Sequence, residues 1–139
     1  MKKIITMLSV LTLTACGGIT RITPESQDSI ENLLPVIHPD GGQLCVCRTS
    51  NYAGSGLVPI LEANGEYIGR LPNNSFFCVN LMPDDYAITS DCWNCARVGA
   101  ETTIRQGERK FMELFLGFNG KNIHRTSREM GLSCIAGRM

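Results

Sequence analysis

The chain has 139 residues, of which 43% are hydrophobic, and its 13 basic and 13 acidic side chains give a formal net charge of zero. A neutral chain without a basic cluster offers no electrostatic reason to bind nucleic acid, so we predict no nucleic-acid partner. The length is that of a single small domain.

Residues 1–15 have the parts of a secretory signal peptide. Lys2 and Lys3 form a positive start, and residues 4–13 form an uncharged, mostly apolar stretch. About ten such residues suit a signal peptide and fall short of the ~20 that a membrane-spanning helix needs. Removing this segment takes away Lys2 and Lys3 and leaves 11 basic against 13 acidic side chains.

Cys16 ends the motif Leu13-Thr14-Ala15-Cys16, which resembles the bacterial lipobox. The resemblance implies that cleavage makes Cys16 the new N-terminus, carrying a diacylglycerol and, in many bacteria, an amide-linked acyl chain such as palmitate. Two or more acyl chains anchor a protein durably. Gly17 and Gly18 follow without an Asp, which by resemblance to the enterobacterial sorting rule favours the outer membrane. We therefore expect a lipid-anchored protein of the bacterial cell envelope, with its domain in the periplasm or at the cell surface.

Residues 16–35 are polar and irregular and predict a tether between the lipid and the domain. Within it, Ile30, Leu33 and Leu34 recur at helical spacing and indicate one short amphipathic helix, packed on the domain or lying near the membrane. Pro35 would end that helix.

Residues 36–139 predict an all-β domain. Asn64-Gly65 is the strongest hairpin signal, Asn119-Gly120 predicts a second reversal, and Pro59 indicates an edge strand or a bulge. Short strands at regular spacing favour a sandwich or a barrel. The runs expected as strands are 44–48, 57–62, 66–71, 75–81, 86–90, 110–116 and 121–125.

The stretch VPILEANGEYIGRLPNNSFFCV, residues 58–79, resembles the signature of a family of small bacterial lipoproteins of unknown function. These proteins carry a PEGA-like, immunoglobulin-like β-sandwich. The resemblance extends over about residues 36–116 and departs at Pro83-Asp84-Asp85, where relatives usually have Pro-Gly. It implies the sandwich fold and transfers no catalytic motif.

The chain has seven cysteines. With Cys16 acylated, an even set remains, and in an oxidising envelope such a set predicts disulfides, here with 15 possible pairings. Cys45 and Cys47 alternate in one strand and face the same side, which disfavours a bond between them. Cys92 and Cys95 could pair within a turn, whereas in an extended strand they would face opposite sides. The six disulfide candidates are Cys45, Cys47, Cys78, Cys92, Cys95 and Cys134.

Sites for chemistry are few. The C-x-x-C of Cys92 and Cys95 could act as a thiol–disulfide oxidoreductase, but Ala96 onward is a weak helix start and no βαβ pattern surrounds it. A soft-metal thiolate site is a further alternative, on Cys45, Cys47, Cys92 and Cys95. We expect His38 and His124 to be exposed. We expect Asp84, Asp85 and Asp91 to lie in a solvated turn. Phe76 and Phe77 should point to opposite faces of one strand, packed against the tether or a second sheet, or exposed near Tyr52 or Tyr67.

We therefore predict no catalytic residue, no metal site and no cofactor. The expected function is a non-enzymatic binding or structural module of the envelope, held to the membrane by Cys16, with an envelope protein or glycan as partner. The alternatives are a tethered thiol–disulfide oxidoreductase acting through Cys92 and Cys95, and an inhibitor of an envelope-directed enzyme such as lysozyme.

Overall fold

The computed structural model describes residues 22–139. The predicted signal peptide, the predicted lipidation site Cys16 and the first part of the predicted tether lie outside the described residues. None of the helices in the described part is long and apolar enough to cross a membrane.

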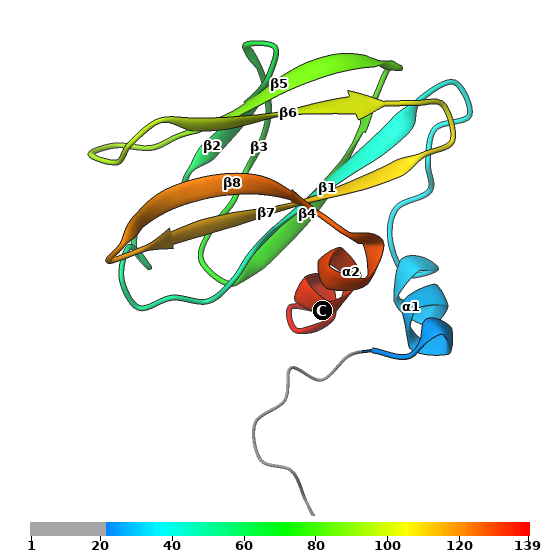
Figure 1. The fold of residues 1–139 in the computed structure, drawn as a ribbon, viewed down its shortest axis with the longest axis horizontal. Coiled ribbons are helices and arrows are strands. Elements are labelled where there is room, and N and C mark those ends of the chain that lie inside the picture. Colours follow the sequence, from blue (N-terminus) through cyan, green and yellow to red (C-terminus); the bar gives the residue numbers. More distant parts are fainter. Residues whose placement is uncertain (1–21) are drawn as a thin grey trace, which may run out of the picture.

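Two four-stranded sheets pack face to face (Figure 1). Every hydrogen-bonded pair of strands is antiparallel except β1 and β7, which run parallel. The β-rich prediction is thus confirmed as a mixed, two-sheet arrangement. In spatial order, sheet A consists of β4 (Ser75–Leu81), β1 (Gly42–Arg48), β7 (Arg109–Gly117) and β8 (Gly120–Thr126). Sheet B consists of β3 (Glu66–Arg70), β2 (Ile60–Ala63), β5 (Asp84–Asp91) and β6 (Val98–Ile104).

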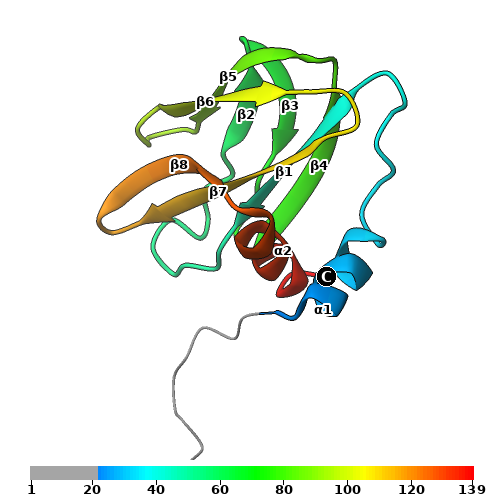
Figure 2. The same ribbon diagram turned by 45° about the vertical axis from the view of Figure 1, so that its right-hand side comes forward.

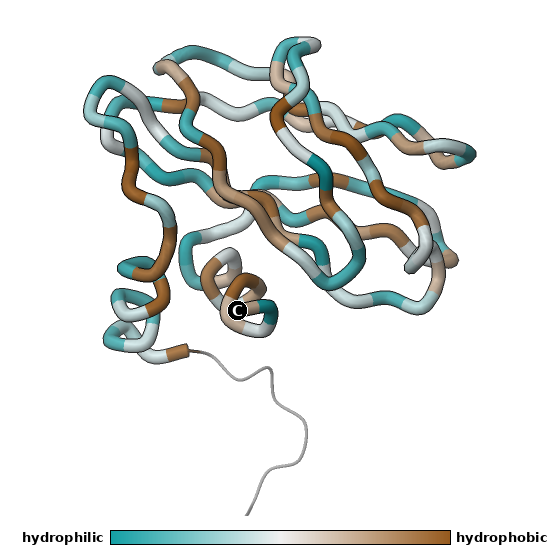
Figure 3. The backbone as a smooth tube through the Cα atoms, turned by 180° about the vertical axis from the view of Figure 1, so that it is seen from behind, coloured by the Kyte–Doolittle hydropathy of each residue, from teal (hydrophilic) through white to brown (hydrophobic). Residues whose placement is uncertain are grey.

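The main core lies between the sheets. Alternate residues of each strand point inward, so Leu44 and Val46 of β1 meet Leu61 of β2 and Ile88 of β5 there. Burying one apolar side chain of this size contributes about 1.5–3 kcal/mol. Figure 3 shows apolar segments along the strands and in both helices.

A second apolar cluster lies on the outer face of sheet A, beneath two helices (Figure 2). The helices are α1 (Pro24–Glu31) and α2 (Arg128–Ala136). Leu132 and Ile135 of α2 are fully buried against Phe111 of β7 and the outward-facing cysteines of β1. The domain is therefore mostly β, and its two short helices, of which α2 was not predicted, cover the apolar outer face of sheet A.

Part of the predicted tether belongs to the folded domain. Glu31 at the end of α1 accepts a hydrogen bond from Arg109 Nη1 at 2.9 Å and another from Arg128 Nε at 2.7 Å. Asp28 accepts from Arg128 Nη2 at 2.8 Å. Of the two sequence alternatives for the short helix, packing on the domain is the one observed. Asn32 is its C-cap, so the helix ends before Pro35.

The turns follow local chemistry with two exceptions. Asn64 and Gly65 both have positive φ, 50° and 83°, as a type I′ hairpin requires. The second reversal is displaced by one residue: Phe118 and Asn119 form the turn, and Gly120 pairs with Gly117 at φ 114°. Pro59 precedes β2, which lies inside sheet B; the bulge of this strand falls between Leu61 and Glu62.

Candidate functional site

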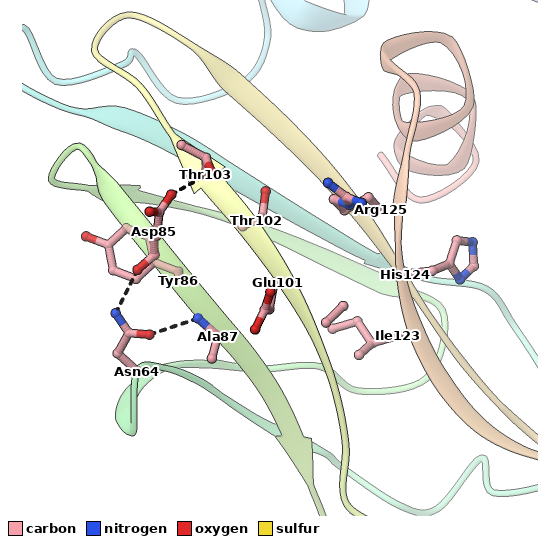
Figure 4. Close-up of a pocket in the computed structure, with 11 residues that line it drawn as sticks. Asn64, Asp85, Tyr86, Ala87, Glu101, Thr102, Thr103, Ile123, His124 and Arg125 are labelled. Carbon is pink, nitrogen blue, oxygen red and sulfur yellow. Dashed lines mark hydrogen bonds between the residues drawn. The ribbon is translucent and has the colours of Figure 1, made fainter.

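A shallow groove of about 1020 Å³ lies along one side of the sandwich (Figure 4). β6 is the last strand of sheet B on this side and β8 is the last strand of sheet A, and the two lie against each other. The groove therefore lies where two sheet edges meet. Its lining residues are Asn64, Asp85, Tyr86, Ala87, Ala100, Glu101, Thr102, Thr103, Ile123, His124 and Arg125.

Hydrogen bonds hold one wall of this groove in place. The Asn64 side chain joins the hairpin turn to β5: its Nδ2 donates to the Asp85 carbonyl at 3.0 Å, and its Oδ1 accepts from the Ala87 amide at 2.8 Å. Thr103 donates to the Asp85 carboxylate at 2.6 Å. Tyr86 donates its hydroxyl to the Met82 carbonyl at 2.7 Å. Burial, with the nearby carboxylates of Asp84 and Glu66, raises the pKa of Tyr86.

Other polar side chains of the groove do not take part in these hydrogen bonds. Thr102 is 4% exposed, and its Oγ1 has no hydrogen-bond partner among the described residues. Glu101 is exposed on β6, and His124 and Arg125 are exposed on β8. The groove thus presents the carboxylate of Glu101 from one sheet and the guanidinium of Arg125 from the other, whereas His124 points away from β6 (Figure 4). Sequence reasoning missed Glu101 and Thr102 because no strand was predicted at β6, whose Val-Gly-Ala-Glu-Thr-Thr-Ile run lacks a strong apolar alternation. It predicted the strand that carries His124 and Arg125 but not its position beside β6.

The six cysteines of the described chain form three pairs. Cys45 on β1 lies directly opposite Cys78 on β4, with a Cα–Cα distance of 4.0 Å, and is disulfide-bonded to it. Cys47 is bonded to Cys134 on α2, at a Cα–Cα distance of 6.2 Å. Cys45 and Cys47 do face the same side of β1, and each bonds to a neighbouring element. The second bond ties α2 to the sheet that it covers.

The third pair, Cys92 and Cys95, lies in the turn between β5 and β6. The Cys95 amide donates to the Cys92 carbonyl at 3.3 Å, and Asn94 takes a positive φ of 59°, which an Asn tolerates in a turn. Of the two alternatives left by the sequence, the turn is the one found. Trp93 at its tip is 86% exposed.

Lys121 of β8 reaches under this turn. Its ammonium donates to the Ser90 carbonyl at 3.0 Å and lies 3.2 Å from Cys95 Sγ and 3.8 Å from Cys92 Sγ. Burial lowers the pKa of Lys121; Asp91 opposes that shift and the positive charge of Arg48 adds to it. No local sequence pattern points to Lys121, because the contact joins strands of different sheets.

The remaining candidates are not brought together. His38 accepts from the Asp40 amide at 3.1 Å, His124 contacts Asn122, and both histidines are exposed. Across residues 22–139, no three His, Cys, Asp or Glu side chains form a group that could hold a metal ion. Cys45 and Cys47 lie on sheet A beneath α2 and Cys92 and Cys95 lie at the β5–β6 turn, with different partners, so these four cysteines form no common thiolate site.

The aromatic residues divide between core and surface. Phe77 packs on the core between the sheets and Phe76 on the cluster beneath the helices, so both faces of β4 are covered. Tyr67 is 61% exposed and Tyr52 is 89% exposed.

No protein-family model matches the chain, and no curated protein matches it. Among solved structures, the chain is similar to the "NMR structure of the protein from Eubacterium rectale", with 8% sequence identity and a TM-score of 0.45. That match covers 63% of this chain and 90% of the other.

Proposed function

We propose that this protein is a lipid-anchored module of the bacterial cell envelope that binds an extended polypeptide segment in the groove between β6 and β8. The observation that carries the proposal is the position of the groove at two adjacent sheet edges. The last strand of a sheet presents unpaired backbone N–H and C=O groups, to which an added strand can pair. The mixed charge of Glu101 and Arg125 would set the register of such a segment.

The anchor and the fold family are part of the same proposal. Lipidation of Cys16, and a PEGA-like, immunoglobulin-like class for the sandwich, rest on the sequence motifs, with the two packed sheets as support for the second. Because α1 is docked on the domain, only residues 17–23 separate Cys16 from Pro24. A linker of that length spans at most about 25 Å when fully extended. The module would therefore act close to the membrane that holds it.

The groove can be tested by site-specific photo-crosslinking in intact envelopes of the full chain. A photoreactive residue in place of Thr103, which is exposed on β6, should attach to a polypeptide. Glu101→Lys in the same chain should reduce the yield of that adduct about tenfold. Reversing the charge of a side chain that contacts the ligand costs about 1 kcal/mol or more of binding free energy.

The matched control is a photoreactive residue in place of Arg70, which is exposed on β3 at the opposite edge of sheet B. Equal adducts from positions 70 and 103 would contradict a specific groove. An adduct with glycan alone would replace the polypeptide ligand by a sugar polymer and overturn the proposal in this form.

A further inference from the structure

Three loops meet at the end of the sandwich that lies away from α1 (Figures 1 and 2). They are the connection 49–59 after β1, the turn of Cys92 and Cys95, and the β7–β8 turn at Phe118 and Asn119. A depression of about 360 Å³ joins all three, with Cys95 and Lys121 among its lining residues. This loop end is separate from the binding groove, whose lining shares no residue with it.

The three disulfides have very different surroundings. Cys45 and Cys47, one partner in each of the other two bonds, are both 1% exposed and lie beneath the helices. Cys78 and Cys134, the other partners of those bonds, are partly exposed, and so are both Cys92 and Cys95, which lie in a surface turn. Cys92–Cys95 is therefore the one bond of the described residues in which neither cysteine is buried. A bond across a sequence separation of 3 also restricts the unfolded chain less than bonds across separations of 33 and 87 do. Accessibility and this small constraint mark Cys92–Cys95 as the bond that exchanges most readily.

The distinguishing feature is the cation beside the sulfur atoms. A thiolate is stabilised by a nearby ammonium, and a better stabilised thiolate is a better leaving group. Thioredoxin-like sites obtain this effect from a helix N-terminus. The turn of Cys92 and Cys95 leads into β6 instead, and the positive charge comes from Lys121 across the sandwich, 3.2 Å from Cys95 Sγ.

We propose that Cys92–Cys95 is a thiol–disulfide exchange site for a cysteine-bearing polypeptide, with Lys121 as the residue that stabilises the Cys95 thiolate. The inference goes beyond the proposed binding function and does not depend on it. It gives Cys92 and Cys95 a chemical role in addition to closing the turn.

In this exchange the partner dithiol gives two electrons to the Cys92–Cys95 disulfide. A thiolate of the partner polypeptide attacks Cys92 Sγ, a new S–S bond forms between them, and the Cys92–Cys95 bond breaks with its electron pair on Cys95 Sγ. The Lys121 ammonium faces that new thiolate. A second thiolate of the partner then attacks the partner's own sulfur in the mixed bond and releases Cys92 as a thiolate. The partner dithiol is oxidised to a disulfide, the Cys92–Cys95 disulfide is reduced to a dithiol, and protons return to the thiolates from water.

The charges around the turn favour Cys95 as the leaving group. Lys121 is closer to Cys95 Sγ than to Cys92 Sγ. Asp91 precedes Cys92 in the chain, and its carboxylate lies 3.7 Å from Arg97 Nη1. Attack at Cys92 and departure of Cys95 toward the Lys121 ammonium is therefore the favoured direction.

The surface beside the disulfide suits a polypeptide. A second depression of about 360 Å³ lies on the Cys92 side and is lined by Val58, Ile60 and Trp93. Trp93 and Phe118 are 86% and 87% exposed, one on each of two neighbouring loops. Exposed aromatic side chains next to a reactive sulfur give a partner chain an apolar surface for contact.

The first test is the order in which the disulfides open. The full-length protein in its own membranes is exposed to graded dithiothreitol, alkylated, and digested for mass spectrometry. Cys92 and Cys95 should become alkylated at a reductant concentration at least tenfold lower than Cys45, Cys47, Cys78 and Cys134. If all three bonds open together, or if Cys92–Cys95 opens last, the proposal is wrong.

The second test assigns the effect to Lys121. In the protein with only Cys92–Cys95 reduced, the alkylation rate of Cys95 is followed against pH. Its apparent pKa should lie below the ~8.5 of a free thiol, and Lys121→Gln should raise it by about one unit, a tenfold lower thiolate fraction at neutral pH. Lys110→Gln is the matched control. It removes a lysine of β7 that pairs with Glu108, and it should leave the alkylation rate of Cys95 unchanged.

A third measurement shows whether a partner is used. In Cys95→Ser, Cys92 is a free thiol that can attack the disulfide of the oxidised partner, which is the reverse of the last step above. Because no Cys95 thiolate is present to expel the partner, a mixed disulfide with a polypeptide in the envelope should accumulate and be released by reductant. An unshifted Cys95 pKa in Lys121→Gln refutes the role of Lys121. No mixed disulfide beyond that seen for Cys92→Ser refutes the exchange function, whatever the groove between β6 and β8 binds.

Discussion

At the scale of single residues, Arg48 organises the loop end. It is the last residue of β1, and its side chain lies fully buried on the inner face of the sheet. Its Nη1 donates to the carbonyls of Leu57 and Leu71 at 2.7 and 3.0 Å, and its Nη2 donates to that of Gly54 at 2.8 Å. Burial lowers the pKa of Arg48. One planar cation thus satisfies backbone acceptors from two connections that have no regular structure of their own.

Removing that guanidinium should destabilise the fold. Arg48→Met keeps the aliphatic stem and leaves three carbonyl acceptors unpaired, so we expect a loss of about 3 kcal/mol in the free energy of unfolding. Urea denaturation measures it. Arg48→Lys should not restore the loss, because an ammonium lacks the forked geometry. Arg70→Met, at an exposed position, should stay within about 0.5 kcal/mol of the wild type; an equally small effect of Arg48→Met would show that water replaces the guanidinium.

At the scale of elements, helix α2 depends on a close approach to β7. A Cβ added at Gly131 would lie 2.5 Å from Phe111 Cβ, closer than two such atoms can approach. The glycine therefore costs helix propensity and permits the contact that buries Leu132 and Ile135. The Cys47–Cys134 disulfide holds the helix at this distance.

Gly131→Ala separates these two effects. Helix propensity alone would stabilise the variant by about 1 kcal/mol, whereas displacing α2 from Phe111 costs about 1–3 kcal/mol. We expect a net loss of 1 kcal/mol or more in chemical denaturation. Gly137→Ala is the matched control, since its Cβ would meet only the Cys134 carbonyl at 3.7 Å. That variant should be neutral or slightly more stable, and the same result for Gly131→Ala would contradict the packing argument.

At the scale of the whole molecule, the open question is where the domain is held. If Cys16 carries lipid, growth with a clickable fatty acid should label the wild-type protein, which should sediment with membranes. Cys16→Ser should carry no label and keep its signal segment, a mass difference seen in an electrophoresis gel. Any single acyl chain would hold the protein only marginally, so firm membrane retention also reports on the second chain. An unlabelled wild type would overturn the proposed envelope location.

Much of the β structure was predictable because its signals are local. Asn64-Gly65 specifies a tight reversal by backbone conformation alone, and the flanking alternation of apolar residues defines β2 and β3. β6 and α2 were not predicted, since Gly99 and Gly131 weaken their local propensities and their stability comes from packing. The groove was not predicted either, because β6 forms one of its two edges.

The sequence by itself determined the strand-rich character of the domain and the presence of six cysteines beyond Cys16, and it predicts a secretion signal. These are properties of composition and short-range pattern. Only the tertiary structure decided which cysteines pair, that part of the tether docks on sheet A, and that Lys121 lies against Cys95. Each of those contacts joins residues far apart in the chain, and their geometry depends on how the two sheets and two helices bury their apolar faces together.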